Sequence, residues 1–178
     1  MKDSKFSTKK LTYLAMLIAC CVIGRSVFQS IPNVQPVTDI IIFTTIFFSF
    51  WEGSIVAVLT ILITNMYMGM GLWTIFQIIS YLVIILIAYI LKFIPKFKKD
   101  MKLQAIYSLF AGYIYGIVIS IFSVLSFSCI ENFPKKVILY DINGFSFDTM
   151  HAIGNFILYL TFIPIFKKLE TSYFNKEK

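Results

Sequence analysis

Long apolar runs alternate with short polar segments along the whole chain. A helix rises about 1.5 Å per residue and needs roughly 20 residues to cross the hydrocarbon core of a bilayer. Six runs approach this length, the second being somewhat short, and they cover residues 11–29, 36–50, 53–68, 73–94, 103–130 and 147–166. The pattern therefore predicts an all-α integral membrane protein, built as a six-transmembrane-helix bundle.

Polar connections join these runs at the two ends of the predicted bundle. At one end we expect three connections, SIPNVQPVTD (30–39), MGMGLWT (68–74) and ENFPKKVILYDINGFSFD (131–148). The first of them is rigid, because Pro32 and Pro36 fix φ and restrict the residues before them. At the other end, SFWEGS (49–54) predicts a tight turn between the second and third runs, and Pro95 is expected to end the fourth run.

Basic residues favour one orientation of this bundle. Thirteen of the sixteen lie in three segments, which hold Lys2, Lys5, Lys9 and Lys10; Lys92, Lys96, Lys98, Lys99 and Lys102; and Lys167, Lys168, Lys176 and Lys178. Basic residues are retained on the cytoplasmic side of a membrane, and six spans place all three segments on one side. We therefore predict an N-in/C-in topology with a cytoplasmic tail at 1–10, a membrane domain at 11–166 and a cytoplasmic tail at 167–178.

The composition excludes most other classes of protein. Of the 178 residues, 58% are apolar and 14% are charged, whereas soluble domains average about 45–50% apolar and about 25% charged residues. The net charge of +7 is explained by topology and not by nucleic acid, because no base-reading motif accompanies it. Cys20, Cys21 and Cys129 lack metal-ligand spacing, and we interpret them as small buried apolar side chains.

Polar side chains in and beside the apolar runs predict a binding site at the outer end of the bundle. Such groups are costly inside a bilayer and are often functional. Amides, hydroxyls and aromatic rings suit a medium-sized organic ligand that is held by hydrogen bonds and stacking. The candidate substrate-binding residues are Asn33, Gln35, Thr38, Asn65, Trp73, Gln77, His151 and Asn155.

Other interpretations of these residues stay open. The 30–39 segment could be a simple turn whose second proline opens the next helix. Trp73 could be an anchor at the membrane interface, and His151, the only histidine, could be a hydrogen-bonded structural group. For Arg25, the only arginine, we favour an ion pair with Asp39 over contact with a ligand anion.

Motifs for catalysis and for ATP binding are missing from the sequence. It contains no H-E-x-x-H, no G-x-S-x-G and no G-x-x-x-x-G-K-[ST], and no pair of acids is spaced as a metal site. We therefore expect no catalytic residue, no metal, no cofactor and an external energy source. Ala15 and Ala19 are small residues four apart, which let another helix approach closely in lipid, although from the spacing alone packing within the chain is the simpler interpretation.

Three stretches of the sequence resemble the substrate-binding S component of energy-coupling factor (ECF) vitamin transporters. They are LAMLIA (14–19), GRSVFQSIPNVQPVTDIIIF (24–43) and TNMYMGMGLWTIFQI (64–78). The IPNVQPVT segment followed by N-x(3)-G-x-G-x-W-T-x-x-Q is similar to one branch of these proteins. The resemblance covers most of residues 11–94.

The resemblance implies that several proteins act together in transport. The S component lies in the lipid bilayer of a prokaryotic plasma membrane, binds a vitamin from outside, and docks on an ECF transmembrane coupling subunit driven by two cytoplasmic ATPase subunits. Docking carries over to Ala15 and Ala19. The ligand-binding role carries over by motif to Asn33, Gln35, Thr38, Asn65, Trp73 and Gln77.

Alternatives stay open for the identity of the ligand and for the class of function. The IPNVQPVT branch is most similar to S components for cobalamin or related corrinoids, with pantothenate, riboflavin or another vitamin precursor as alternatives. A small membrane-embedded enzyme that uses His151 with Asp148 is a competing hypothesis, and the missing second catalytic group argues against it. A scaffold protein without a ligand is a third hypothesis, and the polar cluster at the outer end argues against that.

Overall fold

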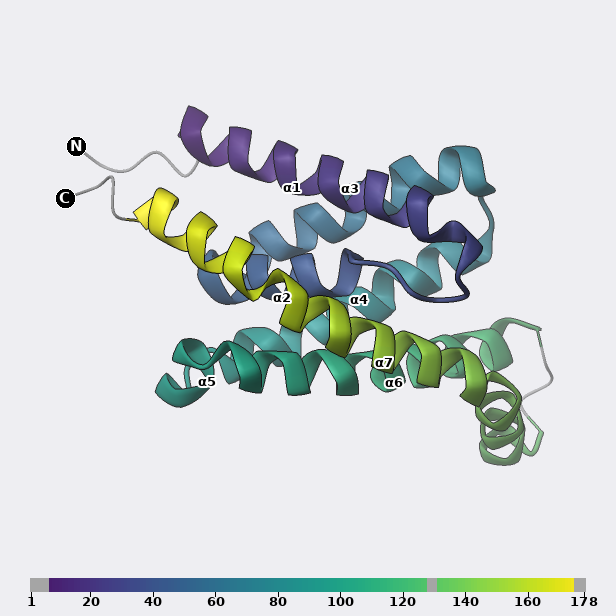
Figure 1. Cartoon of the computed structure of the whole chain (residues 1–178). Coiled ribbons are helices and arrows are strands. Elements are labelled where there is room, and N and C mark those ends of the chain that lie inside the picture. Colours follow the sequence, from purple (N-terminus) through teal and green to yellow (C-terminus); the bar gives the residue numbers. More distant parts are fainter. Residues whose placement is uncertain (1–6, 128–130, 175–178) are drawn as a thin grey trace.

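The computed structural model describes residues 7–127 and 131–174. Lys2, Lys5, Cys129, Lys176, Lys178 and the end of the predicted fifth run lie outside these residues. The regular structure in the described ranges is helical (Figure 1). The helices are α1 (Thr8–Val27), the 3₁₀ turn η1 (Phe28–Ser30), α2 (Val37–Phe47), α3 (Phe50–Met68), α4 (Leu72–Leu91), α5 (Pro95–Lys99), α6 (Met101–Phe127) and α7 (Phe133–Phe174).

Five of the described helices, α1, α3, α4, α6 and α7, are long and apolar enough to cross a membrane. The prediction of an all-α protein with several membrane-spanning helices is therefore confirmed. Helix α2 has only 11 residues, so its length is about 16 Å at 1.5 Å per residue. That is about half of the roughly 30 Å hydrocarbon core, and the count of six spanning helices stays a prediction.

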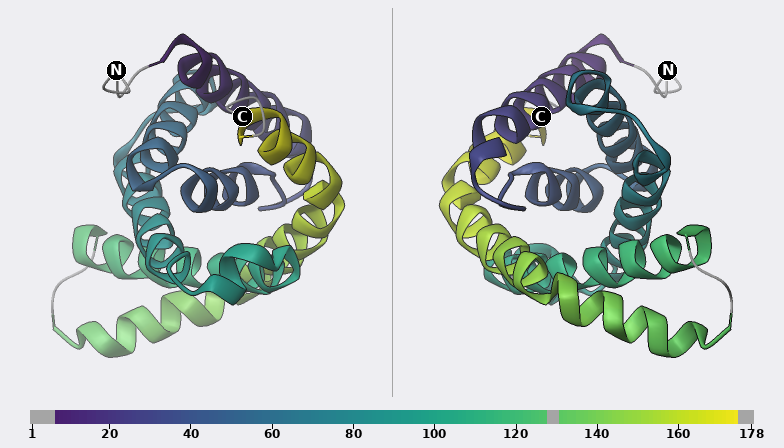
Figure 2. Two further views of the ribbon diagram at one scale, coloured as in Figure 1. Left: turned by 90° about the vertical axis from the view of Figure 1, so that its left-hand side faces the viewer. Right: turned by 90° about the vertical axis from the view of Figure 1, so that its right-hand side faces the viewer.

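Helix α2 lies inside a ring formed by the five long helices (Figure 2). It packs against each of them, and all eleven of its residues are buried. Seven of its eleven residues are apolar, and a helix with apolar residues on every side belongs in a core. The hydroxyls of Thr44 and Thr45 donate to the carbonyls of Ile40 and Ile41 at 2.6 and 2.8 Å, so these two polar groups are satisfied within α2 itself.

Residues 31–36 account for the short length of α2. From η1 this segment runs back into the ring before α2 begins (Figure 1). A side chain at Gly24 of α1 would collide with the ring of Pro36, and one at Gly154 of α7 would come within 2.9 Å of Val34. Irregular backbone of this kind is tolerated at membrane depth when protein surrounds it. Of this segment only Pro36 is buried, whereas Ile31, Pro32 and Asn33 are exposed. The predicted connection therefore starts at the surface and enters the interior at its end, and Thr38 and Asp39 belong to α2.

The bundle has two distinct ends (Figure 1). One end, named here the lysine end, carries the described termini, the α2–α3 turn and α5. The opposite end, named the loop end, carries η1, the α3–α4 turn at 69–71, the last turns of α6 and the first turns of α7. The described lysines of the three segments lie at the lysine end, while the orientation of the bundle in a membrane stays a prediction.

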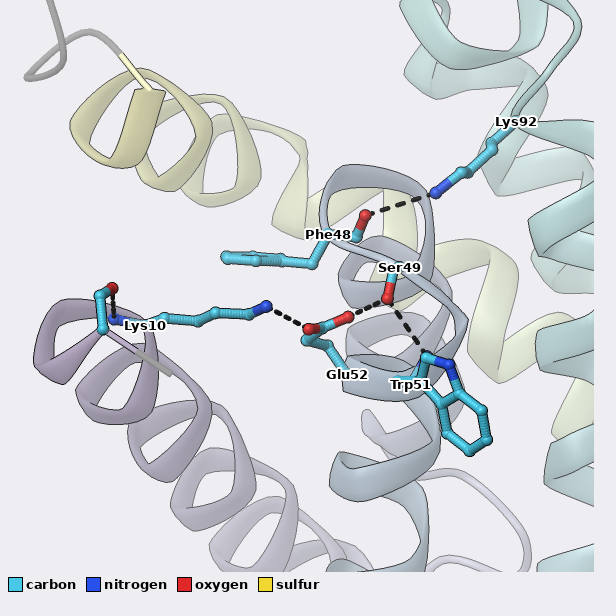
Figure 3. A network of polar contacts seen from close by, with 7 residues as sticks. Lys10, Phe48, Ser49, Trp51, Glu52 and Lys92 are labelled. Atoms are coloured by element: carbon cyan, nitrogen blue, oxygen red, sulfur yellow. Dashed lines mark hydrogen bonds and ion pairs between the residues drawn. The ribbon is translucent and has the colours of Figure 1, made fainter. Parts of the chain in front are cut away.

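A polar network ties α1 to α3 at the lysine end (Figure 3). Lys10 forms an ion pair with Glu52, and Glu52 also accepts a hydrogen bond from Ser49 Oγ. Ser49 is the N-cap of α3 and its hydroxyl accepts from the backbone N–H of Trp51 at 3.3 Å, which satisfies one free N–H of the first turn. The turn predicted at 49–54 is therefore limited to residues 48 and 49, because Glu52 already belongs to the helix.

Lys92 joins the same network from the end of α4 (Figure 3). Its Nζ donates to the carbonyl of Phe48 at 3.3 Å. Partial burial, helped by the charge of Lys98, lowers the pKa of Lys92. Helix α4 ends at Leu91, and Pro95 opens α5 at the first helical position, where a missing N–H costs nothing.

Residues 133–148 are helical, so the prediction of a connection over 131–148 was wrong for most of its length. Helix α7 begins at Phe133 and continues to Phe174, which also makes most of the predicted C-terminal tail helical. Figure 2 shows the first turns of α7 beside the last turns of α6, both extending sideways beyond the ring. Large apolar side chains such as Ile138, Leu139 and Ile142 are exposed there, which fits contact with lipid or protein better than with water.

Gly112 allows α6 and α7 to approach closely. A Cβ atom at this position would lie 2.5 Å from the backbone nitrogen of Ala152 and 2.6 Å from its Cα. We expect Gly112→Ala to lower the free energy of unfolding by about 1–3 kcal/mol through overpacking, measured as a lower thermal midpoint in detergent. Gly144→Ala is the matched control, because its methyl group would meet only the Asp148 carboxylate at 3.6 Å. Equal midpoints for the two variants would contradict this account of the helix pair.

Candidate functional site

Two adjoining cavities lie at the loop end. The smaller, of about 190 Å³, lies beside α1, and its polar lining includes Arg25, Gln29, Asn33, Gln35, Gln77 and Tyr115. The larger, of about 430 Å³, lies between α4, α6 and α7, and its lining includes Trp73, Ser120, Tyr140, Asn143, Phe147 and Asp148. Asn33, Gln77 and Tyr115 line both cavities. We therefore treat the two cavities as one site, named the loop-end site.

Asn65 holds Gln77 in the wall between the two cavities. The Asn65 amide donates to Gln77 Oε1 and to Thr74 Oγ1, both at 2.8 Å, and only 2% of Asn65 is exposed. Thr74 Oγ1 in turn accepts from the N–H of Gly71, at 3.4 Å, where α4 begins. Gly69, just before it, has a φ of 114°, which a residue with a side chain rarely adopts. The α3–α4 turn and Gln77 are thus positioned by one buried amide.

The segment 31–36 supplies two further amides. Asn33 has a φ of 57°, a conformation that asparagine tolerates better than most residues, and its amide donates to the carbonyl of Phe147 at 3.4 Å. Gln35 Nε2 donates to the hydroxyl of Tyr81 at 3.3 Å. These contacts join the segment to α7 and α4, so three helices and one re-entrant segment fix the positions of the lining amides.

A buried polar layer lies behind the wall of the site. Thr38 Oγ1 and His151 Nε2 are 3.0 Å apart, and the His151 ring meets the ring of Tyr115 edge-on at 5.0 Å. Asn155 Nδ2 donates to the carbonyl of Ser108 at 3.3 Å, and the Ser108 hydroxyl donates to Asp39. This layer links α2, α6 and α7 directly beneath Tyr115.

The predicted substrate-binding residues therefore divide into two groups. Asn33, Gln35, Trp73 and Gln77 line the loop-end site. Thr38, Asn65, His151 and Asn155 are each at most 2% exposed and lie behind that lining. The structure thus gives direct access to four of the eight. Asn155 lies deeper in the bundle, beside Ser108 in the first half of α6.

Arg25 and the pair of small residues in α1 have clear positions. The favoured ion pair between Arg25 and Asp39 is not formed, since Arg25 Nη1 donates to Thr64 Oγ1 at 2.8 Å and Asp39 contacts Ser108. Ala15 and Ala19 are exposed in the middle part of α1, Ala15 on the lysine-end side of its midpoint and Ala19 just beyond it. Packing within the described chain therefore leaves both alanines uncovered.

Sequence reasoning missed most of the lining that α7 provides. Tyr140, Asn143, Gly144, Phe147 and Asp148 line the larger cavity, and their spacing of three and four places them on one face of a helix. That spacing was a usable signal, but it lies in a segment interpreted as a connection, where helical periodicity was not sought.

With the geometry in place, comparison with known families decides the class of protein. A family model described as "ECF transporter, substrate-specific component" matches residues 9–163. The chain belongs to this family. No curated protein and no solved structure matches it significantly. The match includes every residue that lines the loop-end site of this S component, and it ends within α7.

Family membership fixes the general role of the S component. It is a multi-pass membrane protein that binds a small-molecule substrate and works with other subunits of an ECF transporter. Its loop-end site is polar beside α1, where amides and a guanidinium converge, and aromatic beside α7, where Trp73, Tyr115, Tyr140 and Phe147 lie. A site with these two sides can hold an organic ligand by hydrogen bonds on one side and by ring contacts on the other.

Proposed function

We propose that this S component captures a vitamin at the loop-end site, from outside a prokaryotic cell. The observation that carries the proposal is the convergence of the Asn33, Gln35 and Gln77 amides with the Trp73 and Tyr115 rings around the two cavities. The lysines at the opposite end favour a cytoplasmic lysine end, which turns the loop end outward. Together, α2 and the segment before it connect both ends and account for a sixth crossing.

Delivery is proposed to follow from docking on an ECF transmembrane coupling subunit that two cytoplasmic ATPase subunits drive. Ala15 and Ala19 support this part of the proposal, because both are exposed near the middle of α1. Small exposed residues four apart let a partner helix approach closely within a bilayer. The docking surface is separate from the loop-end site, because neither alanine lines its two cavities.

The ligand is proposed to be cobalamin or a related corrinoid, on the strength of the IPNVQPVT segment, with pantothenate, riboflavin or another vitamin precursor as the alternative. Cavities of a few hundred Å³ hold a compact vitamin completely. A corrinoid is larger, so part of it would extend from the open mouth of the loop-end site.

A thermal-shift screen of the protein purified in detergent tests the proposed function. We expect one vitamin among cyanocobalamin, pantothenate and riboflavin to raise the thermal midpoint, because a ligand at a hundredfold excess over its Kd stabilises the folded state by about 2.7 kcal/mol. Mass spectrometry of small molecules that co-purify with the protein would identify the ligand independently. A flat screen together with an empty co-purification would contradict the proposal.

A further inference from the structure

Arg25 brings a positive charge to the smaller cavity. It lies near the end of α1, and its Nη1 donates to Thr64 Oγ1 of α3 at 2.8 Å. Thr64 is completely buried, so this hydrogen bond directs the guanidinium toward the interior of the ring. Arg25 lines the cavity together with Gln35, Gln77 and Tyr115. The charge thus faces the same space as the lining amides.

No acidic side chain of the described residues neutralises this charge. The ion pair of the described chain joins Lys10 to Glu52 at the opposite end, and the nearby acid of α2, Asp39, accepts from Ser108. A guanidinium has five N–H donors, and the hydrogen bond to Thr64 uses one of them. A partly buried charge without a counter-ion is unfavourable, which makes the cavity complementary to an anion.

The rest of the loop-end site favours one position for that anion. Asp148 lines the larger cavity on the far side of Asn33, Gln77 and Tyr115. Its carboxyl group repels an anion placed there, while the guanidinium attracts one on the α1 side. A ligand that fills both cavities would therefore direct its acidic group toward Arg25 and its neutral or hydrogen-bond-donating part toward Asp148.

We propose that Arg25 forms an anion subsite that binds the ionised acid group of the transported vitamin. This inference rests on the proposed function and narrows it to a class of ligand. The phosphodiester of cobalamin and the carboxylate of pantothenate both suit the planar fork of a guanidinium, whereas riboflavin carries no ionised acid at neutral pH. An anionic lipid headgroup has the same chemistry, but the hydrogen bond to buried Thr64 turns Arg25 away from the surrounding bilayer.

The test compares each vitamin that carries an ionised acid group with an analogue that lacks that group. Dicyanocobinamide lacks the phosphodiester and nucleotide of cyanocobalamin, and pantothenol has an alcohol in place of the carboxylate of pantothenate. For whichever pair binds, we expect Arg25→Gln to weaken binding of the acid roughly tenfold to a hundredfold, the range of one charge-assisted contact, and to leave the analogue unaffected. Arg25→Lys should keep part of the affinity, because it keeps the charge.

Two matched variants separate binding of an anion from a purely structural role. Thr64→Val removes the hydrogen bond between α1 and α3 but keeps the guanidinium, so binding of the acid should fall much less than in Arg25→Gln. Lys135→Gln removes one positive charge from an exposed position of α7 and should change nothing. An equal loss for acid and analogue in Arg25→Gln, or an equal loss in Thr64→Val, would overturn the anion subsite.

Three further outcomes are distinct. If riboflavin is the vitamin that binds, the anion subsite is wrong while the proposed function stands. If phosphatidylglycerol added to phosphatidylcholine discs competes with the vitamin in the native protein but not in Arg25→Gln, the anion is a lipid headgroup and the inference is overturned. If no vitamin binds, the proposed function itself fails.

Discussion

Replacing Ala15 and Ala19 together by tryptophan is expected to reduce vitamin uptake by whole cells to background while leaving vitamin binding unchanged. Both alanines are exposed on α1, so the large rings disturb no packing within the described chain. They would instead keep the helix of a coupling subunit from the close approach that small residues permit. Uptake of labelled vitamin and the Kd of the purified protein are the two measurements.

A matched pair on another face of the ring controls for the effect of bulk alone. Leu86 and Ile90 of α4 are also four residues apart, and both are exposed, at 49% and 59%. Leu86→Trp with Ile90→Trp should therefore leave uptake intact. The docking assignment would be wrong if the alanine double variant kept its uptake, or if both double variants lost it equally.

Asn65→Ala is expected to weaken vitamin binding by about tenfold and to destabilise the protein by about 1–3 kcal/mol, because buried Thr74 and half-buried Gln77 both lose a hydrogen bond. Asn65 does not line the loop-end site. It acts by holding Gln77 Oε1 and Thr74 Oγ1, each at 2.8 Å. Calorimetric titration of the vitamin and thermal unfolding measure the two effects.

A double-mutant cycle shows whether Asn65 acts through Gln77. Residues that belong to one hydrogen-bonded unit have non-additive effects, so Asn65→Ala combined with Gln77→Ala should bind little worse than Gln77→Ala alone. Fully additive losses would show that Asn65 contacts the ligand by itself, contrary to its burial.

The ends of the helices could be predicted where an apolar run meets a strong punctuating residue. Ser49, Gly69 and Gly71 bound α3 and α4 close to the predicted positions. The start of α7 could not, because Asn143 and Gly144 together are a typical turn signal. In the structure both lie within α7, beside α6, and line the larger cavity, so tertiary packing and the site override the local preference.

The central position of α2 also lay beyond sequence reasoning. An apolar helix reads the same whether its neighbours are lipid tails or other helices. The run at 36–50 therefore looked like a short span, and only its contacts with all five long helices distinguish it. The Arg25–Asp39 prediction was wrong because closeness in sequence does not fix the direction of a side chain. Asp39 contacts Ser108, 69 residues away.

The sequence indicated which residues lie near the site better than it indicated which of them are buried. Asn33, Gln35, Trp73 and Gln77, taken from the segment 31–36 and the start of α4, line the loop-end site in the structure, and their role in binding stays a prediction. Thr38 and His151 show the limit, because a single polar residue on an apolar helix can face a cavity or a partner. Here they face each other at 3.0 Å, and no pattern in either helix alone contains that information.

The burial of every residue of α2 within the ring has a consequence for how cargo moves. A ligand bound at the loop end is separated from the lysine end by the buried side chains of α2. We therefore expect no continuous aqueous path along the bundle axis. We therefore expect the protein to carry one bound substrate molecule per transport cycle and not to act as a channel. The transport rate would then depend on how fast the whole protein changes the side of the membrane to which its site is open. No single substitution among the residues that line the cavities should produce leak currents.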